Sequence, residues 1–216
     1  MSVSSPRTVR AADVAPALWR NGGGRTRELF AWPASADWTL RISVAEIDAD
    51  GPFSAFPGVQ RWFAVLSGAG VELHFADGTC RLDAASAPLA FDGAAAPGCS
   101  LVAGPTRDLN LMLRGATRGV LLRASSGIAW SDAWRWRAAY AAGTARIVLA
   151  NGATVDVDAG TLVAPLPPGA CRIDASRPDV PMFWIGVDAD AETSVFVEAT
   201  GGNAGEVGGG AGGGVG

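Results

Sequence analysis

The strictest constraint on the fold is a set of short segments in which apolar and polar residues alternate. In residues 40–45, LRISVA, aliphatic side chains alternate with Arg41, Ser43 and Ala45. Residues 107–114, RDLNLMLR, carry three leucines at every second position. A period of two is typical of β-strands whose two faces meet different surroundings. Other short apolar runs are separated by turn residues and helical periodicity is scarce, so the sequence predicts an all-β sandwich or barrel.

The second half of the chain repeats the order of the first. The segment 71–84, VELHFADGTCRLDA, aligns with 145–159, ARIVLANGATVDVDA, and an Asn-Gly turn replaces an Asp-Gly turn. Four matches in one order and at nearly constant spacing indicate a duplication, and hence two related β-barrels in one chain. The other matching pairs are Arg61-Trp62 with Arg135-Trp136, Pro97-Gly98 with Pro168-Gly169, and 108–112 with 179–183.

A candidate pocket lies between residues 38 and 68. If both faces of the strand at 40–45 are enclosed, its polar side chains point into a cavity, and an enclosed guanidinium needs an anion or several acceptors. The loop 51–58, GPFSAFPG, is stiffened by two prolines and carries two phenylalanines that would wall the mouth. Arginines on both sides of this loop predict a site for a small anionic ligand. The predicted ligand-binding residues are Arg41, Ser43, Arg61, Asp108, Asn110, Phe53, Phe56, Trp19 and Asn21.

Within this set we expect Arg41 to be the principal anion clamp and Arg61 to be a second cation or a buttress. Ser43 and Asn110 are expected to be neutral hydrogen-bonding partners. Asp108 is expected either to hold an arginine in position or to accept an N–H from the ligand. A structural alternative stays open, because an Arg41–Asp108 ion pair would leave no free charge for a ligand.

Composition excludes several other kinds of function. The 17 basic residues are all arginine, and the net charge of −4 argues against a general nucleic-acid surface. No apolar run approaches the ~18 residues of a membrane span, and the first residues lack the apolar core of a secretory signal. Three widely spaced cysteines indicate isolated thiols rather than disulfides or a zinc site. We therefore expect a cytoplasmic protein with no nucleic-acid or membrane partner; exposed barrel edges allow a homodimer.

Five motifs together resemble the HutD/Ves family. They are WRNGGGRT at 19–26, RISVA at 41–45, GPFS at 51–54, FPG at 56–58 with Arg61, and DLNLM at 108–112. The resemblance implies a bicupin of the RmlC-like cupin superfamily, with two jelly-roll-like barrels in one subunit. It also implies a link to histidine utilisation, in which HutD is an accessory or regulatory protein, and a small carboxylate ligand such as formylglutamate or urocanate. The motifs do not separate HutD-type from Ves-type members.

The inventory of reactive residues points to binding rather than catalysis. The usual cupin metal centre needs several histidines and a glutamate, whereas this chain has one histidine, His74. A Ser-His-Asp triad would also need His74, and the G-x-S-x-G elbow is absent. We assign no catalytic residue, metal or other cofactor. The alternative is a metal-free cupin enzyme, an isomerase or lyase of a small organic acid, that works through Asp108 or a neighbouring carboxylate.

These observations divide the chain into three parts. Residues 1–115 are predicted to form the first barrel, which holds the ligand pocket, although residues 1–17 look irregular. Residues 116–199 are predicted to form the second barrel as a degenerate repeat. Residues 200–216 are expected to be a disordered Gly-rich tail, because they offer no apolar surface for a core.

Overall fold

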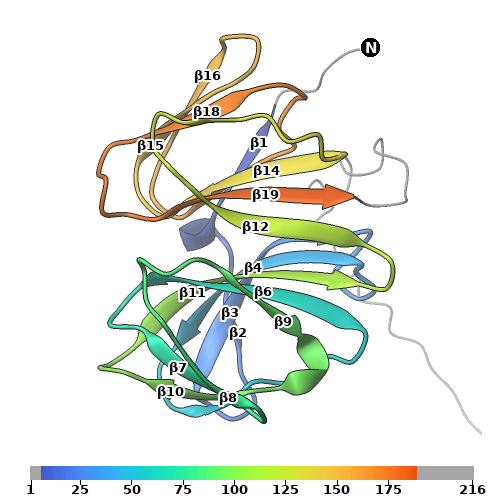
Figure 1. Ribbon diagram of the computed structural model, residues 1–216, viewed down its shortest axis with the longest axis vertical. Coiled ribbons are helices and arrows are strands. Elements are labelled where there is room, and N and C mark those ends of the chain that lie inside the picture. The colour runs from blue at the N-terminus through green and yellow to red at the C-terminus, as the bar shows by residue number, and fades with distance from the viewer. Residues whose placement is uncertain (1–5, 189–216) are drawn as a thin grey trace, which may run out of the picture.

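The computed structural model describes residues 6–188, and these residues form two stacked β-barrels (Figure 1). The predicted all-β class is confirmed, because the helices of this range are two single 3-10 turns, η1 (Ala11–Asp13) and η2 (Gly93–Ala95). No helix in this part of the chain is long and apolar enough to cross a membrane. The predicted Gly-rich tail, 200–216, lies outside the described residues.

The first barrel consists of a six-stranded sheet that faces a four-stranded sheet. The larger sheet has the order β2-β3-β4-β11-β6-β9, and the smaller has the order β5-β10-β7-β8. Every neighbouring pair is antiparallel. The strands are β2 (Ala17–Leu18), β3 (Gly24–Trp32), β4 (Leu40–Ile47), β5 (Gly51–Pro52), β6 (Val59–Ser67), β7 (Val71–Phe75), β8 (Gly78–Leu82), β9 (Leu89–Asp92), β10 (Gly98–Leu101) and β11 (Thr106–Arg114).

The second barrel repeats this plan. Its smaller sheet has the order β13-β18-β15-β16, which matches β5-β10-β7-β8, and its larger sheet has the order β1-β17-β14-β19-β12. The strand order agrees with the duplication seen in the sequence. The strands are β12 (Arg118–Ala124), β13 (Ala129–Trp130), β14 (Trp136–Ala141), β15 (Ala145–Val148), β16 (Thr154–Val157), β17 (Thr161–Ala164), β18 (Cys171–Ala175) and β19 (Met182–Asp188).

The start of the chain is more regular than its sequence indicates. Strand β1 (Arg7–Arg10) pairs with β17, so the first strand extends the sheet of the second barrel. In Figure 1 this blue strand lies among the yellow and orange strands of the upper barrel. The expectation that residues 1–17 are irregular is therefore wrong for residues 7–10. The four residues of β1 lack an apolar face. Backbone pairing with β17, which is distant in the sequence, defines this strand.

The alternating strands divide their residues between two different interiors. On β4, Leu40, Ile42 and Val44 are fully buried in a cluster that also contains leucines of β11 and residues of β14 and β19. This cluster joins the larger sheets of the two barrels. The intervening residues, Arg41 and Ser43, belong to the opposite face and line the interior of the first barrel. Alternation therefore places one face of β4 in the contact between barrels and the other face in a cavity.

Candidate functional site

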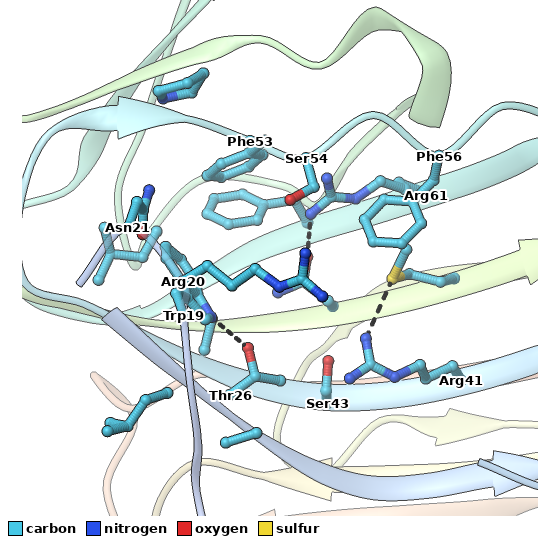
Figure 2. Close-up of a pocket in the computed structure, with 18 residues that line it drawn as sticks. Trp19, Arg20, Asn21, Thr26, Arg41, Ser43, Phe53, Ser54, Phe56 and Arg61 are labelled. Atoms are coloured by element: carbon cyan, nitrogen blue, oxygen red, sulfur yellow. Dashed lines mark hydrogen bonds between the residues drawn. The ribbon is translucent and has the colours of Figure 1, made fainter. Parts of the chain in front are cut away.

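A cavity of about 580 Å³ lies inside the first barrel (Figure 2). Strands β4, β6 and β11 contribute its floor, the loop 51–58 one wall, and the hairpin 17–24 another. Of the nine residues predicted from the sequence, all except Asp108 line it. The structure thus brings together Trp19, Asn21, Arg41, Ser43, Phe53, Phe56, Arg61 and Asn110, and it adds Arg20, Thr26, Ser54, Phe63 and Met112. Their roles in binding remain predictions.

Arg61 is the most unusual group in the cavity. It is only 6% exposed, and its Nη2 donates to Asn110 Oδ1 at 2.9 Å. The Arg61 Nε and Nη1 atoms have no hydrogen-bond partner among the described residues. No carboxylate of the described residues forms an ion pair with Arg61. Burial, followed by the nearby charge of Arg41, lowers the pKa of Arg61 to about 10, so the guanidinium stays charged at neutral pH.

Aromatic rings surround the Arg61 guanidinium. Its central carbon lies 4.8 Å from the centroid of the Phe53 ring, 5.8 Å from that of Phe56 and 5.1 Å from that of Phe91. Ring faces attract a cation, but they offer no acceptor for its N–H groups. The predicted phenylalanines therefore flank the charge without satisfying its remaining donors.

Arg41 already has an acidic partner. Its Nε lies 2.6 Å from Glu28 Oε2, and both side chains are partly exposed. Strand β3 is irregular between Glu28 and Phe30, so that Glu28 pairs with Ser43 and lies on the same face as Arg41. The geometry thus leaves Arg61, and not Arg41, without an acidic partner among the described residues.

Asp108 lies on the same face of β11 as Asn110, inside the first barrel, but it does not line the cavity. It is fully buried, and the Thr106 hydroxyl donates to Oδ2 at 2.8 Å, while Oδ1 has no partner among the described residues. Burial raises the pKa of Asp108 to about 8. The Arg41–Asp108 ion pair considered from the sequence is wrong, because Arg41 pairs with Glu28.

The glycine-rich motif builds the hairpin that closes one side of the cavity. The Trp19 amide donates to the Gly24 carbonyl at 2.9 Å, and Trp19 Nε1 donates to Thr26 Oγ1 at 2.8 Å. A Cβ at Gly24 would lie 2.3 Å from the Glu46 carbonyl oxygen, and Gly22 has φ +71°. Glycine is therefore required by close approach at one position and by backbone conformation at the other.

Arg20 is the cavity residue that the sequence reasoning missed. It follows Trp19 in the hairpin, and Figure 2 shows it reaching into the cavity toward the side of Arg41 and Arg61. No described residue forms a hydrogen bond or ion pair with it. The Trp-Arg-Asn-Gly-Gly-Gly motif could have predicted this placement of Arg20. The tight turn that brings Trp19 and Asn21 to the cavity also brings the residue between them.

The second barrel contains a closed counterpart of the Arg61 site. Arg137 is 2% exposed, and its guanidinium carbon lies 4.4 Å from the ring centroid of Trp130. It donates to three backbone carbonyls, those of Pro167 at 2.8 Å, Gly169 at 2.6 Å and Trp130 at 2.9 Å. The sequence alignment paired Arg61 with Arg135, which is exposed, whereas the arginine of β14 that is buried beside an aromatic ring, as Arg61 is, is Arg137. Three backbone carbonyls accept hydrogen bonds from Arg137, whereas no backbone carbonyl of the described residues accepts one from Arg61.

The single histidine lies away from the cavity. His74 is exposed on β7, with Nδ1 3.2 Å from Thr79 Oγ1 and Nε2 3.0 Å from Ser100 Oγ. Residues 6–188 contain no group of three or more His, Cys, Asp or Glu side chains arranged to hold a metal ion. The donor set of a metal-binding cupin therefore does not fit the residues present.

Two jelly-roll-like β-barrels in one subunit, with a cavity inside the first, define a bicupin. The sequence comparison agrees: the HutD family model matches residues 11–176, and the chain belongs to the HutD family. It is 38% identical over 99 residues to Protein Ves of Citrobacter koseri, which is 45% of this chain and 52% of that protein. The Escherichia fergusonii Protein Ves is 36% identical over the same length. The chain thus spans about half the length of the curated relatives it matches.

Solved structures share the whole architecture. A conserved protein of unknown function from Pseudomonas aeruginosa PAO1 superposes with a TM-score of 0.75 and 26% identity, over 86% of this chain and 100% of that chain. HutD from Pseudomonas fluorescens SBW25 gives 0.73 and 23%, over 87% and 100%. A Lactobacillus farciminis oxalate decarboxylase gives 0.55 and 12%, over 87% and 86%, which indicates a shared fold alone.

Proposed function

We propose that this chain is an accessory or regulatory binding protein linked to histidine utilisation, and that it binds a small carboxylate metabolite in its first barrel. Formylglutamate and urocanate are the ligands to test first. Family membership supports the metabolic link. The observation that carries the binding role is Arg61, a buried cation with two free donors and no acidic partner among the described residues.

An unpaired buried charge is costly to a folded protein. Taking a cation out of water destabilises the fold by several kcal/mol unless an opposite charge or enough acceptors compensate it. Asn110 supplies one acceptor, at 2.9 Å. A ligand carboxylate would supply two more oxygens in the planar arrangement that a guanidinium binds best. Arg137 supports the same interpretation, because a similar buried arginine in the second barrel is compensated by three carbonyls.

The enzymatic alternative has less support. It needs an acid or base beside the ligand, and Asp108 does not line the cavity. The titratable side chains among the lining residues are arginines. Guanidinium groups hold their protons at neutral pH and so bind and orient an anion more readily than they exchange a proton with it.

A thermal-shift screen tests the proposal, with formylglutamate, urocanate, histidine, glutamate and formate at pH 7.5. A ligand at 100 times its Kd adds about 2.7 kcal/mol, which for a chain of this length raises the Tm by roughly 5–10 °C. The shift should vanish in Arg61→Gln. It should persist in Arg118→Gln, which makes the same change of charge at an exposed residue of β12 outside the cavity.

Two results would contradict the proposal. If none of the acids raises the Tm, or if Arg61→Gln retains the full shift, the Arg61 site does not bind these carboxylates. Proton NMR of each acid incubated with the purified protein addresses the alternative. A bound acid that stays chemically unchanged agrees with a binding protein, whereas its conversion at a rate that scales with protein concentration identifies an enzyme.

A further inference from the structure

We infer that the ligand of this cavity is a dianion, a dicarboxylate with a short carbon chain, and that Arg20 is the residue that selects its second charge. This inference rests on the proposed function, because it assumes that one carboxylate occupies the Arg61 site. It extends that function by assigning a specificity-determining role to the hairpin that carries Arg20 (Figure 2).

The lining of the cavity carries an excess of positive charge. Three arginines line it, Arg20, Arg41 and Arg61, and the described lining includes no aspartate or glutamate. Glu28, behind Arg41, compensates that one guanidinium at 2.6 Å. Two positive charges therefore remain without a described counter-ion. A monoanion would neutralise one of them, whereas a dianion neutralises both.

The backbone around Arg20 is held on both sides. The Trp19 amide donates to the Gly24 carbonyl at 2.9 Å, and the Gly22 amide donates to the Trp19 carbonyl at 3.0 Å. The Trp19 indole is fixed by its 2.8 Å hydrogen bond to Thr26. These bonds hold the backbone on both sides of Arg20, whose side chain lines the cavity. The hairpin thus presents the second cation in a defined place.

Apart from the arginines, the cavity lining is mostly aromatic and apolar, with a few neutral polar side chains. The rings of Phe53 and Phe63 lie 5.5 Å apart between their centroids, and Phe56, Trp19 and Met112 complete the lining around them. Such walls suit methylene groups and offer few partners to additional polar groups. Arg61 lies deep and 6% exposed, while Arg20 lies on the exposed hairpin. A ligand that reaches both has its two carboxylates at opposite ends of a carbon chain.

Isothermal titration calorimetry at pH 7.5 tests the inference with ligands of known charge. Succinate, glutarate, adipate and pimelate are compared with butyrate, valerate, hexanoate and heptanoate, which have the same numbers of carbon atoms. We expect at least one dicarboxylate to bind ten times more tightly than its matched monocarboxylate. Arg20→Gln should weaken that dicarboxylate by about 10- to 100-fold, the loss typical of one charge-assisted contact, and change the monocarboxylate less than threefold. Arg118→Gln is the matched control and should change neither.

The outcomes separate this inference from the function on which it rests. If matched mono- and dicarboxylates bind equally, and Arg61→Gln weakens both while Arg20→Gln weakens neither, the dianion inference is wrong and the carboxylate site stands. If Arg20→Gln weakens both classes alike, Arg20 steers anions in general and does not select a second charge. If no acid of either series binds, both the inference and the proposed function fail.

Discussion

Replacing Asp108 by asparagine should remove a pH-dependent loss of stability. The Asp108 carboxyl is fully buried, with the Thr106 hydroxyl donating to one oxygen and no described partner for the other. Burial raises its pKa from 3.8 to about 8, so the carboxyl is protonated in the folded protein at neutral pH. Asparagine keeps the size of the side chain and an acceptor for Thr106, but it cannot ionise.

The sign and size of the effect follow from proton linkage. The folded state retains this proton up to about pH 8, whereas the unfolded chain releases it near the ordinary value of 3.8. Unfolding between these values therefore releases a proton, so the contribution of Asp108 to stability is full below ~pH 4 and is lost as the pH rises to about 8. At roughly 1.4 kcal/mol per pH unit, wild type should lose about 4 kcal/mol relative to Asp108→Asn between pH 5 and pH 8.

Urea unfolding at pH 5, 6, 7 and 8, followed by tryptophan fluorescence, measures this difference directly. The carboxylates whose pKa is lowered by arginines, such as Glu46, are present in both proteins and cancel in the comparison. Asp37→Asn is the control, because its side chain is 94% exposed and its stability curve should run parallel to wild type. Parallel curves for wild type and Asp108→Asn would refute the reasoning, since they would show that Asp108 ionises alike in both states.

Two further pairs of variants test the cavity and its hairpin. Gly24→Ala should cost about 1–3 kcal/mol of unfolding free energy, because its Cβ would lie 2.3 Å from the Glu46 carbonyl; Gly23→Ala, with no contact under 3.5 Å, should cost less than 1 kcal/mol in the same urea melts. Arg61→Met should stabilise the ligand-free protein by about 1–3 kcal/mol, because it removes an uncompensated buried charge, while it abolishes binding. Arg137→Met should instead destabilise by about 2–4 kcal/mol, because it leaves three carbonyls unsatisfied; equal effects of the two substitutions would contradict the contrast between an open and a closed site.

The strands and their faces were predictable because a period of two is a local property. The alternation in 40–45 and 107–114 defined which side chains share a face before any partner strand was known. The cavity lining followed from it, because Arg41, Ser43 and Asn110 all lie on the inner face of one sheet. The duplicated strand order was equally visible, since corresponding hairpins recur at nearly constant spacing.

The partners of the charged groups were not predictable, because they depend on register between strands. A regular β3–β4 pairing would place Glu28 on the face of Phe30, and the irregularity between these residues turns it toward Arg41. Asp108 lies two residues before Asn110 on the same face of β11, yet only Asn110 reaches the cavity. Both outcomes are set by packing between elements distant in sequence, which no local pattern encodes.

The place of β1 has a consequence for how the two barrels form. This strand is synthesised before the other described strands, yet it pairs with β17, with Arg7 opposite Ala164. The larger sheet of the second barrel is therefore complete only after nearly the whole described chain has been synthesised. Pairing over such a sequence separation is slow to form. Until it does, β17 presents an unpaired edge that invites association with other chains. Cutting the gene between the barrels would not yield two independent halves, because the second would lack its outermost strand and the first would carry an unpartnered one.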